Sequence, residues 1–300
     1  MAAPPKYADR PSNAAENTKL RAGTPEDAEA CGRVCSEAFS AIAATHGLPP
    51  EIPSVEVATG LLTGLLSHPG FYSVVAEREG EIVGSNFLDE RSKIAGVGPV
   101  TAQPAVQNGG IGRRLMRDVM ERASARGFAG VRLLTAAHHS RSVSLYASLG
   151  FEVREPIACM QGAPIAAEIP GRHVRSAVEA DLDACNQICE QVHGHDRGGE
   201  LADSIGQGTA AVVERAGRIS GYATAMAFFG HAVGETTDDI KALIATAPAF
   251  DGLGILVPAR NGELFRWCLD SGLCVVQVMM LMTVGPYSQP AGAYLPAILY

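Results

Sequence analysis

The stretch Gln107–Met116 reads QNGGIGRRLM and joins a glycine-rich turn to the start of a helix. It follows the apolar run Ile94–Ala102, which is typical of a strand, and apolar residues then recur at helical spacing from about Arg113 to Arg126. Glycines let several backbone N–H groups point into one concavity, and the dipole of the following helix adds positive potential there. The stretch therefore predicts either an anion site of the kind that holds a pyrophosphate, or a tight turn that needs no ligand.

The spacing of these glycines excludes two common phosphate loops. No Gly-Lys-Ser/Thr follows, so the stretch is not a Walker A loop, and it does not read GxGxxG, which disfavours a dinucleotide fold. Arg113 and Arg114 add positive charge at the rim, although solvated arginines would look the same in the sequence.

Two segments together resemble the signatures of the GNAT family of acyltransferases. Residues 104–112, PAVQNGGIG, are similar to its acyl-CoA loop, and residues 144–151, SLYASLGF, are similar to its Leu-Tyr-x-x-x-Gly-Phe signature. The predicted strand Val131–Ala136 lies between them, as the family requires. The resemblance extends from Lys19 to Met160.

This resemblance implies a site for acetyl-CoA. The backbone of Val100 and Ala102 would bind the pantetheine arm as an added strand, and Tyr146 holds the family's usual general-acid position. His139 stands where the family commonly has an Asn that touches the CoA arm, and it is either such a contact or an exposed loop histidine. The residues whose N–H groups would hold the pyrophosphate are Gln107, Asn108, Gly109, Gly110, Ile111, Gly112 and Arg113.

Direct attack of an amine on a thioester requires a base, because an alkylammonium has a pKa near 10. The predicted strand Ile94–Ala102 contains no carboxylate. The candidates are therefore Asp89 and Glu90 at the end of the preceding strand, or His138 after the strand that ends at Ala136. A solvated hairpin end explains the two carboxylates equally well.

A weak internal repeat divides the chain. Cys35 and Cys189 end similar segments 154 residues apart, Gly84 and Gly221 end similar segments 137 apart, and glycines at 150 and 272 match at 122. The matched segments keep the same order along the chain while the offset between them shrinks. This pattern indicates two copies of one fold with a shorter second copy. We call residues 19–160 the first copy and residues 172–300 the second copy.

The second copy departs from the family pattern where the chemistry would be. It has a single glycine, Gly234, before its helix, and Glu235 would repel a phosphate there. Cys268 stands at the tyrosine position, and Asn261 matches the family's Asn but would equally cap a helix beginning at Gly262. These departures predict a degenerate GNAT-like domain without acyl-CoA.

The expected fold class is α/β (α+β), because strands and helices interleave throughout. Two tandem GNAT-like domains would each form a mixed, mostly antiparallel twisted sheet flanked by helices. The expected organisation is a mobile tail (1–18), an acyl-CoA-binding domain (19–160), a linker (161–171) and the degenerate domain (172–300).

Composition narrows the function classes. The 24 Lys+Arg and 32 Asp+Glu give a formal charge of -8, which argues against nucleic acid as a partner and leaves cationic amines open. No run reaches the roughly 20 apolar residues that span a bilayer, and no secretory signal is evident. The seven cysteines read as buried structural residues, without a metal site, in a cytoplasmic protein. The sequence does not indicate an oligomeric state.

The favoured function is an acetyl-CoA-dependent N-acyltransferase, which moves an acetyl group to a small-molecule amine or a peptide amino group by direct attack in a ternary complex. The alternative is a non-catalytic module that binds CoA or acyl-CoA as a sensor or scaffold.

Overall fold

The computed structural model describes residues 17–300, which fall into two compact units. Unit 1 contains the chain up to Leu88 together with Gly98–Ala125, and unit 2 contains Asp89–Val97 together with Arg126–Tyr300. Most of the expected N-terminal tail, residues 1–16, lies outside the described residues.

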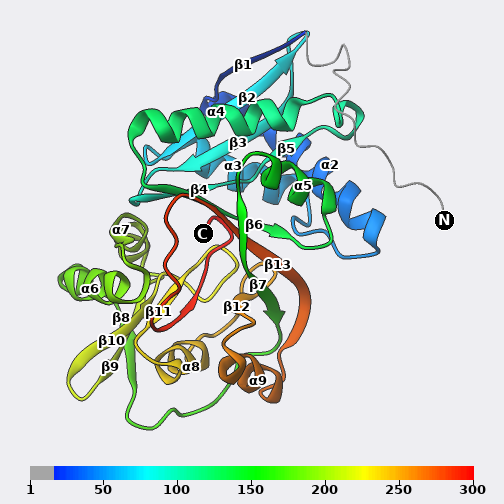
Figure 1. Ribbon diagram of the computed structural model, residues 1–300. Coiled ribbons are helices and arrows are strands. Elements are labelled where there is room, and N and C mark those ends of the chain that lie inside the picture. Colours follow the sequence, from blue (N-terminus) through cyan, green and yellow to red (C-terminus); the bar gives the residue numbers. More distant parts are fainter. Residues whose placement is uncertain (1–16) are drawn as a thin grey trace. The chain divides into compact units, whose positions relative to one another are not determined.

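Unit 1 contains a sheet in the strand order β1-β2-β3, and β5 also pairs with β3. Helix α4 lies across one face of this sheet, and α2 and α3 lie on the other (Figure 1). Its elements are β1 (Thr18–Ala22), η1 (Pro25–Asp27), α2 (Ala28–His46), α3 (Val55–Ser67), β2 (Phe71–Arg78), β3 (Glu81–Asp89), β5 (Thr101–Ala102), η2 (Pro104–Val106) and α4 (Ile111–Arg126).

Local sequence signals account for the ends of these elements. Thr24 and Asp27 form a capping box ahead of α2, and the Ser54 side chain accepts from the Val57 N–H at the start of α3. The β2–β3 turn places Glu79 and Gly80 at φ 55° and 83°, as a two-residue hairpin of the favoured hand requires.

Unit 2 contains two sheets, with strand orders β4-β6-β13-β7-β12 and β14-β11-β10-β9-β8. Its helices are η3 (Glu179–Asp181), α5 (Ser140–Ser148), α6 (Leu182–His193), α7 (Gly198–Gln207), α8 (Thr237–Ala245) and α9 (Gly262–Asp270). Its strands are β4 (Ile94–Val97), β6 (Gly130–Ala136), β7 (Glu152–Gln161), β8 (His173–Ser176), β9 (Ala211–Arg215), β10 (Arg218–Ala223), β11 (Ala232–Gly234), β12 (Ile255–Pro258), β13 (Cys274–Val284) and β14 (Ala293–Leu295).

The long strand β13 lies between β6 and β7 and pairs antiparallel with both. Met279 is opposite Ala136 on one side and Ile157 on the other. Strands from both predicted copies therefore share one sheet and one apolar core in unit 2. The division into two sequence copies remains a prediction, and the compact units are divided along other lines.

The single strand expected over Ile94–Ala102 is divided in the structure. β4 ends at Val97 and β5 begins at Thr101, so Gly98, Pro99 and Val100 lie between two short strands. β4 pairs in parallel with β6, whereas β5 pairs antiparallel with β3. Pro99 has no N–H to donate to a ladder, which accounts for the interruption.

One strand-to-helix junction occurs in both units. An arginine donates to both oxygens of an aspartate, at 2.7 and 2.8 Å in unit 1 and at 2.7 and 2.9 Å in unit 2, and its Nε donates to a glutamate at 2.8 Å in each. The residues are Arg21, Asp27 and Glu77 in unit 1, and Arg175, Asp181 and Glu214 in unit 2. Hydrogen bonds from the arginine lower the pKa of the aspartate in both. The recurrence supports the repeat seen in the sequence.

The fold class is as predicted: the protein is mixed α/β, its sheets are mostly antiparallel, and helices flank them. The predicted burial of the cysteines is confirmed for six of the seven, including Cys31, Cys35, Cys185 and Cys189, but it is wrong for Cys274, which is exposed on β13. Desolvation raises the pKa of Cys35 and Cys185 to about 12, so these thiols stay protonated and pack as small apolar groups.

Candidate functional site

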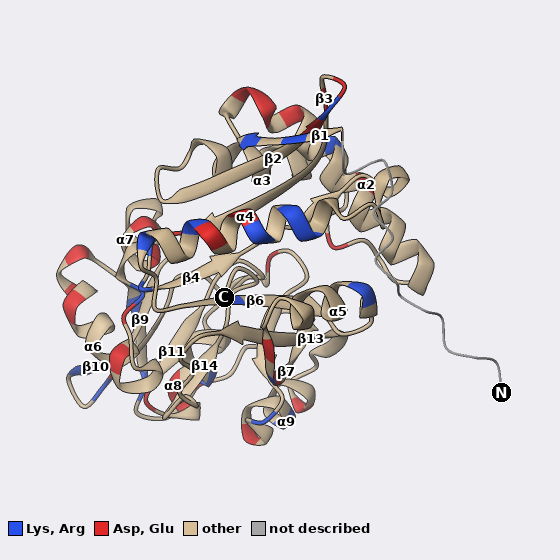
Figure 2. Ribbon diagram, turned by 45° about the horizontal axis from the view of Figure 1, so that its top comes forward, with Lys and Arg blue, Asp and Glu red and all other residues tan. Residues whose placement is uncertain are grey.

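The glycine-rich loop leads directly into α4 in unit 1. Asn108 and Gly110 adopt φ 66° and 83°, and Ile111, which is 1% exposed, anchors the first turn of the helix in the core. The first N–H groups of a helix have no acceptor within it. The first turn of α4 contains no acidic residue, while arginines recur along the helix (Figure 2). The N-terminus of α4 therefore has the positive polarity that binds an anion.

The backbone of Ala102 points away from β3. Gly84 lies opposite Ala102, and the Gln103 N–H donates to the Val83 carbonyl at 2.9 Å. In an antiparallel pair, hydrogen-bonded and non-hydrogen-bonded positions alternate, so Ala102 is a non-hydrogen-bonded position relative to β3. Its N–H and C=O therefore face the other edge of β5, as an added strand requires.

The Gln107 side chain joins this edge to the loop. Its Nε2 donates to the Ala102 carbonyl at 2.8 Å. The glycine-rich loop is therefore tied to the edge of β5 that would receive the pantetheine arm.

Two further side chains hold α4: Asn86, which was not predicted, and Arg114, which was expected only as positive charge at the rim of the loop. Buried Asn86 on β3 donates to the Leu115 carbonyl at 3.3 Å, and Arg114 donates to the Thr18 carbonyl in β1 at 2.7 Å. Asn86 could have been identified from the sequence, because it is a polar residue inside the apolar run of β3.

Helix α5 in unit 2 contains Tyr146, and His139 is its N-cap residue. Ser142 hydrogen bonds with His139 Nδ1 at 2.9 Å and also with Tyr146, so it links the two predicted residues. Burial raises the pKa of Tyr146 to about 12, with the Ser142 hydrogen bond opposing, and its hydroxyl is therefore protonated at neutral pH. Ser142 was missed, although it lies three residues after His139 and four before Tyr146, on one helix face.

The structure separates two of the three candidate bases, Glu90 and His138. β4 and β6 run in parallel; Glu90 precedes β4, while His138 follows β6 on the way into α5. The seven residues of β6 separate these ends by roughly 20 Å. Only His138 thus lies at the edge where α5 begins, and the Glu90 carboxylate lies 3.9 Å from Arg126.

The neighbouring carboxylate, Asp89, forms an ion pair with Arg91. The Arg91 side chain donates to its two oxygens at 2.9 and 2.5 Å. Burial raises the pKa of Asp89 against the opposing effect of Arg91. The side chain is 7% exposed, which leaves little access for a substrate.

In the second copy, the chain's own strand β14 occupies the corresponding edge. Gly234 of β11 lies opposite Gly221, the residue that matches Gly84 in the repeat, and it pairs on its other side with Ala293. A Cβ on the adjacent Gly292 would lie 2.5 Å from the Gly234 carbonyl oxygen, so this close approach requires glycine. The position equivalent to Ala102 is therefore already paired.

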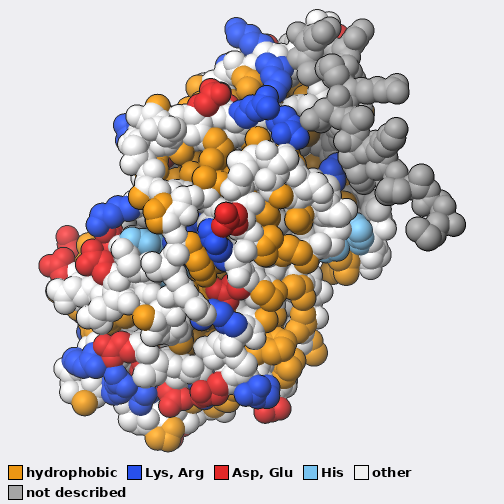
Figure 3. Space-filling model, viewed as in Figure 1, with side chains coloured by type: hydrophobic (Ala, Val, Ile, Leu, Met, Phe, Trp, Pro, Cys, Tyr) orange, Lys and Arg blue, Asp and Glu red, His pale blue; other side chains and the backbone are white. Residues whose placement is uncertain are grey.

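The N-terminus of α8 is closed as well. Thr236 and Asp239 form a capping box, with the Thr236 N–H donating to Asp239 at 2.9 Å. Glu235, just before it, binds Arg218 at 2.6 and 2.7 Å and also pairs with Arg215. Over β9, β10, α8 and α9, acidic and basic side chains are interspersed on the surface (Figure 3).

Helix α9 settles an alternative that the sequence left open. Asn261 is its N-cap, and its Oδ1 accepts from the Leu264 N–H at 3.1 Å. Cys268, at the family's tyrosine position, is fully buried, and burial raises its pKa to about 12. A cavity of about 330 Å³ remains beside the starts of α8 and α9, lined by Glu235, Arg260 and Tyr294 among others.

No helix among residues 17–300 has the length and apolarity that a membrane crossing requires. Within the same range, no three His, Cys, Asp or Glu side chains are grouped so that they would hold a metal ion.

Residues 44–151 match the model of the Acetyltransferase (GNAT) family. An IAA acetyltransferase of Azospirillum brasilense is 31% identical over 93 residues; the match covers 30% of this chain and 61% of that protein, less than two thirds of its length. A protein from Pyrococcus horikoshii, solved as a candidate acetyltransferase, superposes with TM-score 0.70 at 16% identity, over 95% of this chain and 93% of its own.

A tandem GNAT protein from the clavulanic acid biosynthesis pathway superposes with TM-score 0.57 at 12% identity, over 90% of this chain and 100% of its own. At such identities the two structural likenesses show the fold alone. The family model therefore covers residues 44–151 of this chain, and the chain shares its fold with a tandem GNAT protein along most of its length.

Proposed function

We propose that the protein transfers an acetyl group from acetyl-CoA to a primary amine, with its active site in the first copy. The observation that carries the proposal lies in unit 1, where Gln107 ties the outward edge of β5 to the glycine-rich loop that opens α4. One edge accepts an amide-containing arm, and the adjoining helix end accepts a diphosphate.

The binding roles follow from this arrangement. Val100 and Ala102 would hold the pantetheine arm through their backbone groups, and the N–H groups from Gln107 to Arg113 would surround the pyrophosphate. The Arg113 side chain adds charge at the rim. His139 would contact the arm where α5 begins.

The proposed chemistry is direct acyl transfer. The amine loses a proton, for which His138 is better placed than Asp89 or Glu90, and then attacks the thioester carbonyl. The carbon–sulfur bond breaks as the tetrahedral adduct collapses, and Tyr146 donates its proton to the departing thiolate. A phenol with a pKa of about 12 is protonated at neutral pH and is ready to donate.

The second copy would bind no acyl-CoA. β14 pairs with the edge that the pantetheine arm would need, and Asp239 already caps the helix end that the pyrophosphate would need. The acceptor would be a small amine or the amino group of a peptide, and the formal charge of -8 favours cationic compounds.

Calorimetric titration of the purified protein with acetyl-CoA tests the proposal first. One site per chain is expected, and absence of binding at millimolar ligand would overturn both the enzyme and the sensor hypotheses. The Tyr146→Phe variant then separates these two. With a panel of primary amines as acceptors, we expect about a 100-fold loss of CoA release with acetyl-CoA affinity retained. Binding without turnover in the wild type would leave the sensor.

A further inference from the structure

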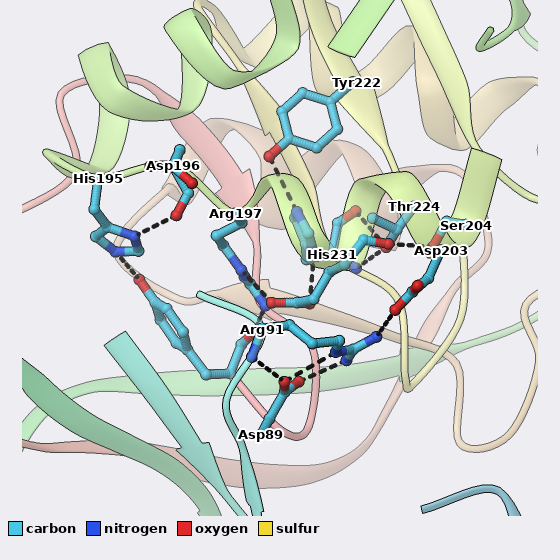
Figure 4. Close-up of polar contacts among 12 residues, drawn as sticks. Asp89, Arg91, His195, Asp196, Arg197, Asp203, Ser204, Tyr222, Thr224 and His231 are labelled. Atoms are coloured by element: carbon cyan, nitrogen blue, oxygen red, sulfur yellow. Dashed lines mark hydrogen bonds and ion pairs between the residues drawn. The ribbon is translucent and has the colours of Figure 1, made fainter. Parts of the chain in front are cut away.

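The segment that leads into β4 is attached to the second copy by ion pairs. Arg91 binds Asp89 beside it, and its Nη1 donates to Asp203 of α7 at 2.8 Å (Figure 4). Lys93 Nζ lies 2.8 Å from Asp196, just before α7. All of these residues belong to unit 2.

A second attachment lies over β4 itself. A Cβ on Gly96 would be 1.9 Å from the Leu299 carbonyl oxygen, so the end of the chain packs directly on this strand. The guanidinium groups of Arg132 and Arg197 lie over the Tyr300 ring, 4.2 and 4.5 Å from its centroid. Arg197 also donates to the main-chain oxygen of Tyr300, and the Tyr300 hydroxyl is 3.2 Å from His195 Nε2.

Both attachments end on the same segment, His195–Asp203. Buried Glu200 anchors this segment, because it accepts from Arg197 at 2.9 and 2.7 Å and contacts His231 Nδ1 at 3.1 Å. Burial opposes ionisation of Glu200, but Arg197 and His231 prevail and lower its pKa. Its charge therefore stays compensated inside the unit.

We propose that residues 195–203 of the second copy act as a clamp that positions β4 of the first copy. The inference rests on the proposed function, because β4 continues through three residues into β5, whose edge at Ala102 would bind acetyl-CoA. Arg91 and Tyr300 are positioning residues that act through β4. The second copy thereby contributes to cofactor binding without a cofactor site of its own.

Asp203→Ala tests the clamp and leaves the Asp89–Arg91 pair in place. The matched control is Glu214→Ala, because Glu214 is 29% exposed and 2.8 Å from Arg175, while Asp203 is 30% exposed and 2.8 Å from Arg91. We expect Asp203→Ala to raise the KM for acetyl-CoA about fivefold with kcat nearly unchanged, and Asp203→Glu to restore most of the loss. Glu214→Ala should leave KM unchanged.

Amide hydrogen exchange on the same proteins, without ligand, provides the second measurement. We expect faster exchange at residues 94–97 in Asp203→Ala and not in Glu214→Ala. Equal KM and equal exchange in the two variants would overturn the clamp. If the wild type bound no acetyl-CoA, the proposed function would fail, and exchange at β4 would still decide whether Asp203 holds this strand.

Discussion

The β5–α4 segment of the first copy and the β11–α8 segment of the second pair in the same way with the preceding hairpin strand. They differ at the far edge of the strand and at the start of the helix. Ala102 and Gly234 lie opposite the matched glycines Gly84 and Gly221, and both face away from the neighbouring hairpin strand. Among residues 17–300, β5 pairs with β3 alone, whereas β11 pairs with β10 and also with β14 on its far side. A strand that can accept a ligand as a further strand can equally accept part of its own chain.

The two helix ends differ in charge as well as in geometry. A glycine loop precedes α4, and the first turn of α4 carries no acidic residue. In contrast, α8 directly follows Glu235–Thr236 and carries Asp238 and Asp239 in its first turn. Asp239 also accepts from Arg172 at 2.7 Å and from Ser220 at 2.9 Å. Capping groups stabilise a helix by occupying the N–H groups that an anionic ligand would use.

Giving α4 the charge of α8 should have the largest effect. We expect Gly112→Asp to weaken acetyl-CoA binding about 100-fold, or about 3 kcal/mol, because a carboxylate would stand beside the pyrophosphate. Gly112→Asn, which has the same shape without the charge, is the control. Thermal melts should show Gly112→Asp at least as stable as the control, since an acid near a helix N-terminus is favourable. Equal affinities in the two variants would place the pyrophosphate elsewhere.

Acid should destabilise the protein through the second copy. Burial, followed by Arg197, lowers the pKa of His231 to about 4, against an ordinary value of 6.5. Between these values the unfolded chain binds a proton that the folded one does not, so stability falls as the pH falls from 6.5 to 4. The loss is about 1.4 kcal/mol per pH unit, or about 2 kcal/mol by pH 5. Urea unfolding at pH 7 and pH 5 measures this loss of stability. The free energy of unfolding of His231→Gln should fall less between these pH values, and an equal fall in the variant and the wild type would rule out His231 as its source.

Forcing β14 away from β11 should cost stability without affecting the first copy. We expect Gly292→Ala to lower the free energy of unfolding by about 2 kcal/mol, since its Cβ would meet the Gly234 carbonyl oxygen. Gly206→Ala is the control, because no atom lies within 4 Å of its added Cβ. Acetyl-CoA affinity should stay within about twofold of wild type, given that ligand and strand bind different copies. A Gly292→Ala variant as stable as the wild type would show that β14 does not pack this closely.

Removing the acid from the second copy should have the smallest effect. We expect Glu235→Gln to cost at most about 1 kcal/mol, because its ion pairs with Arg215 and Arg218 are partly exposed. Calorimetry should still show one acetyl-CoA per chain, since β14 continues to fill the edge. A second binding event in Glu235→Gln would show that charge alone, and not β14, separates the copies.

Local signals predicted much of the candidate site. The positive φ angles of the loop, the start of α4 and the position of Tyr146 in α5 depend on residues close together in the chain. The Arg21–Asp27 and Arg175–Asp181 junctions are also local, with partners six residues apart. Helix caps and tight turns are formed by neighbouring residues, so their residue types are informative.

Pairing between distant strands was not predictable in this way. The run Cys274–Val284 indicates a strand, but its backbone groups would pair with any strand, and only the assembled core places it between β6 and β7. The three residues of β14 are too few to show a period, and Asn86 and Ser142 matter only through the partners that folding brings to them.

The amino-acid sequence by itself determined the glycine loop with its family signatures, and it predicted two copies with no such loop in the second. Each of these is a matter of residue type and spacing along the chain. The tertiary structure alone decided that Ala102 faces outward, that β14 fills the matching edge of β11, and that Arg91 and Tyr300 tie β4 to the second copy. Those features depend on hydrogen-bond register and on contacts between residues about 50 to 200 positions apart, which no local pattern encodes.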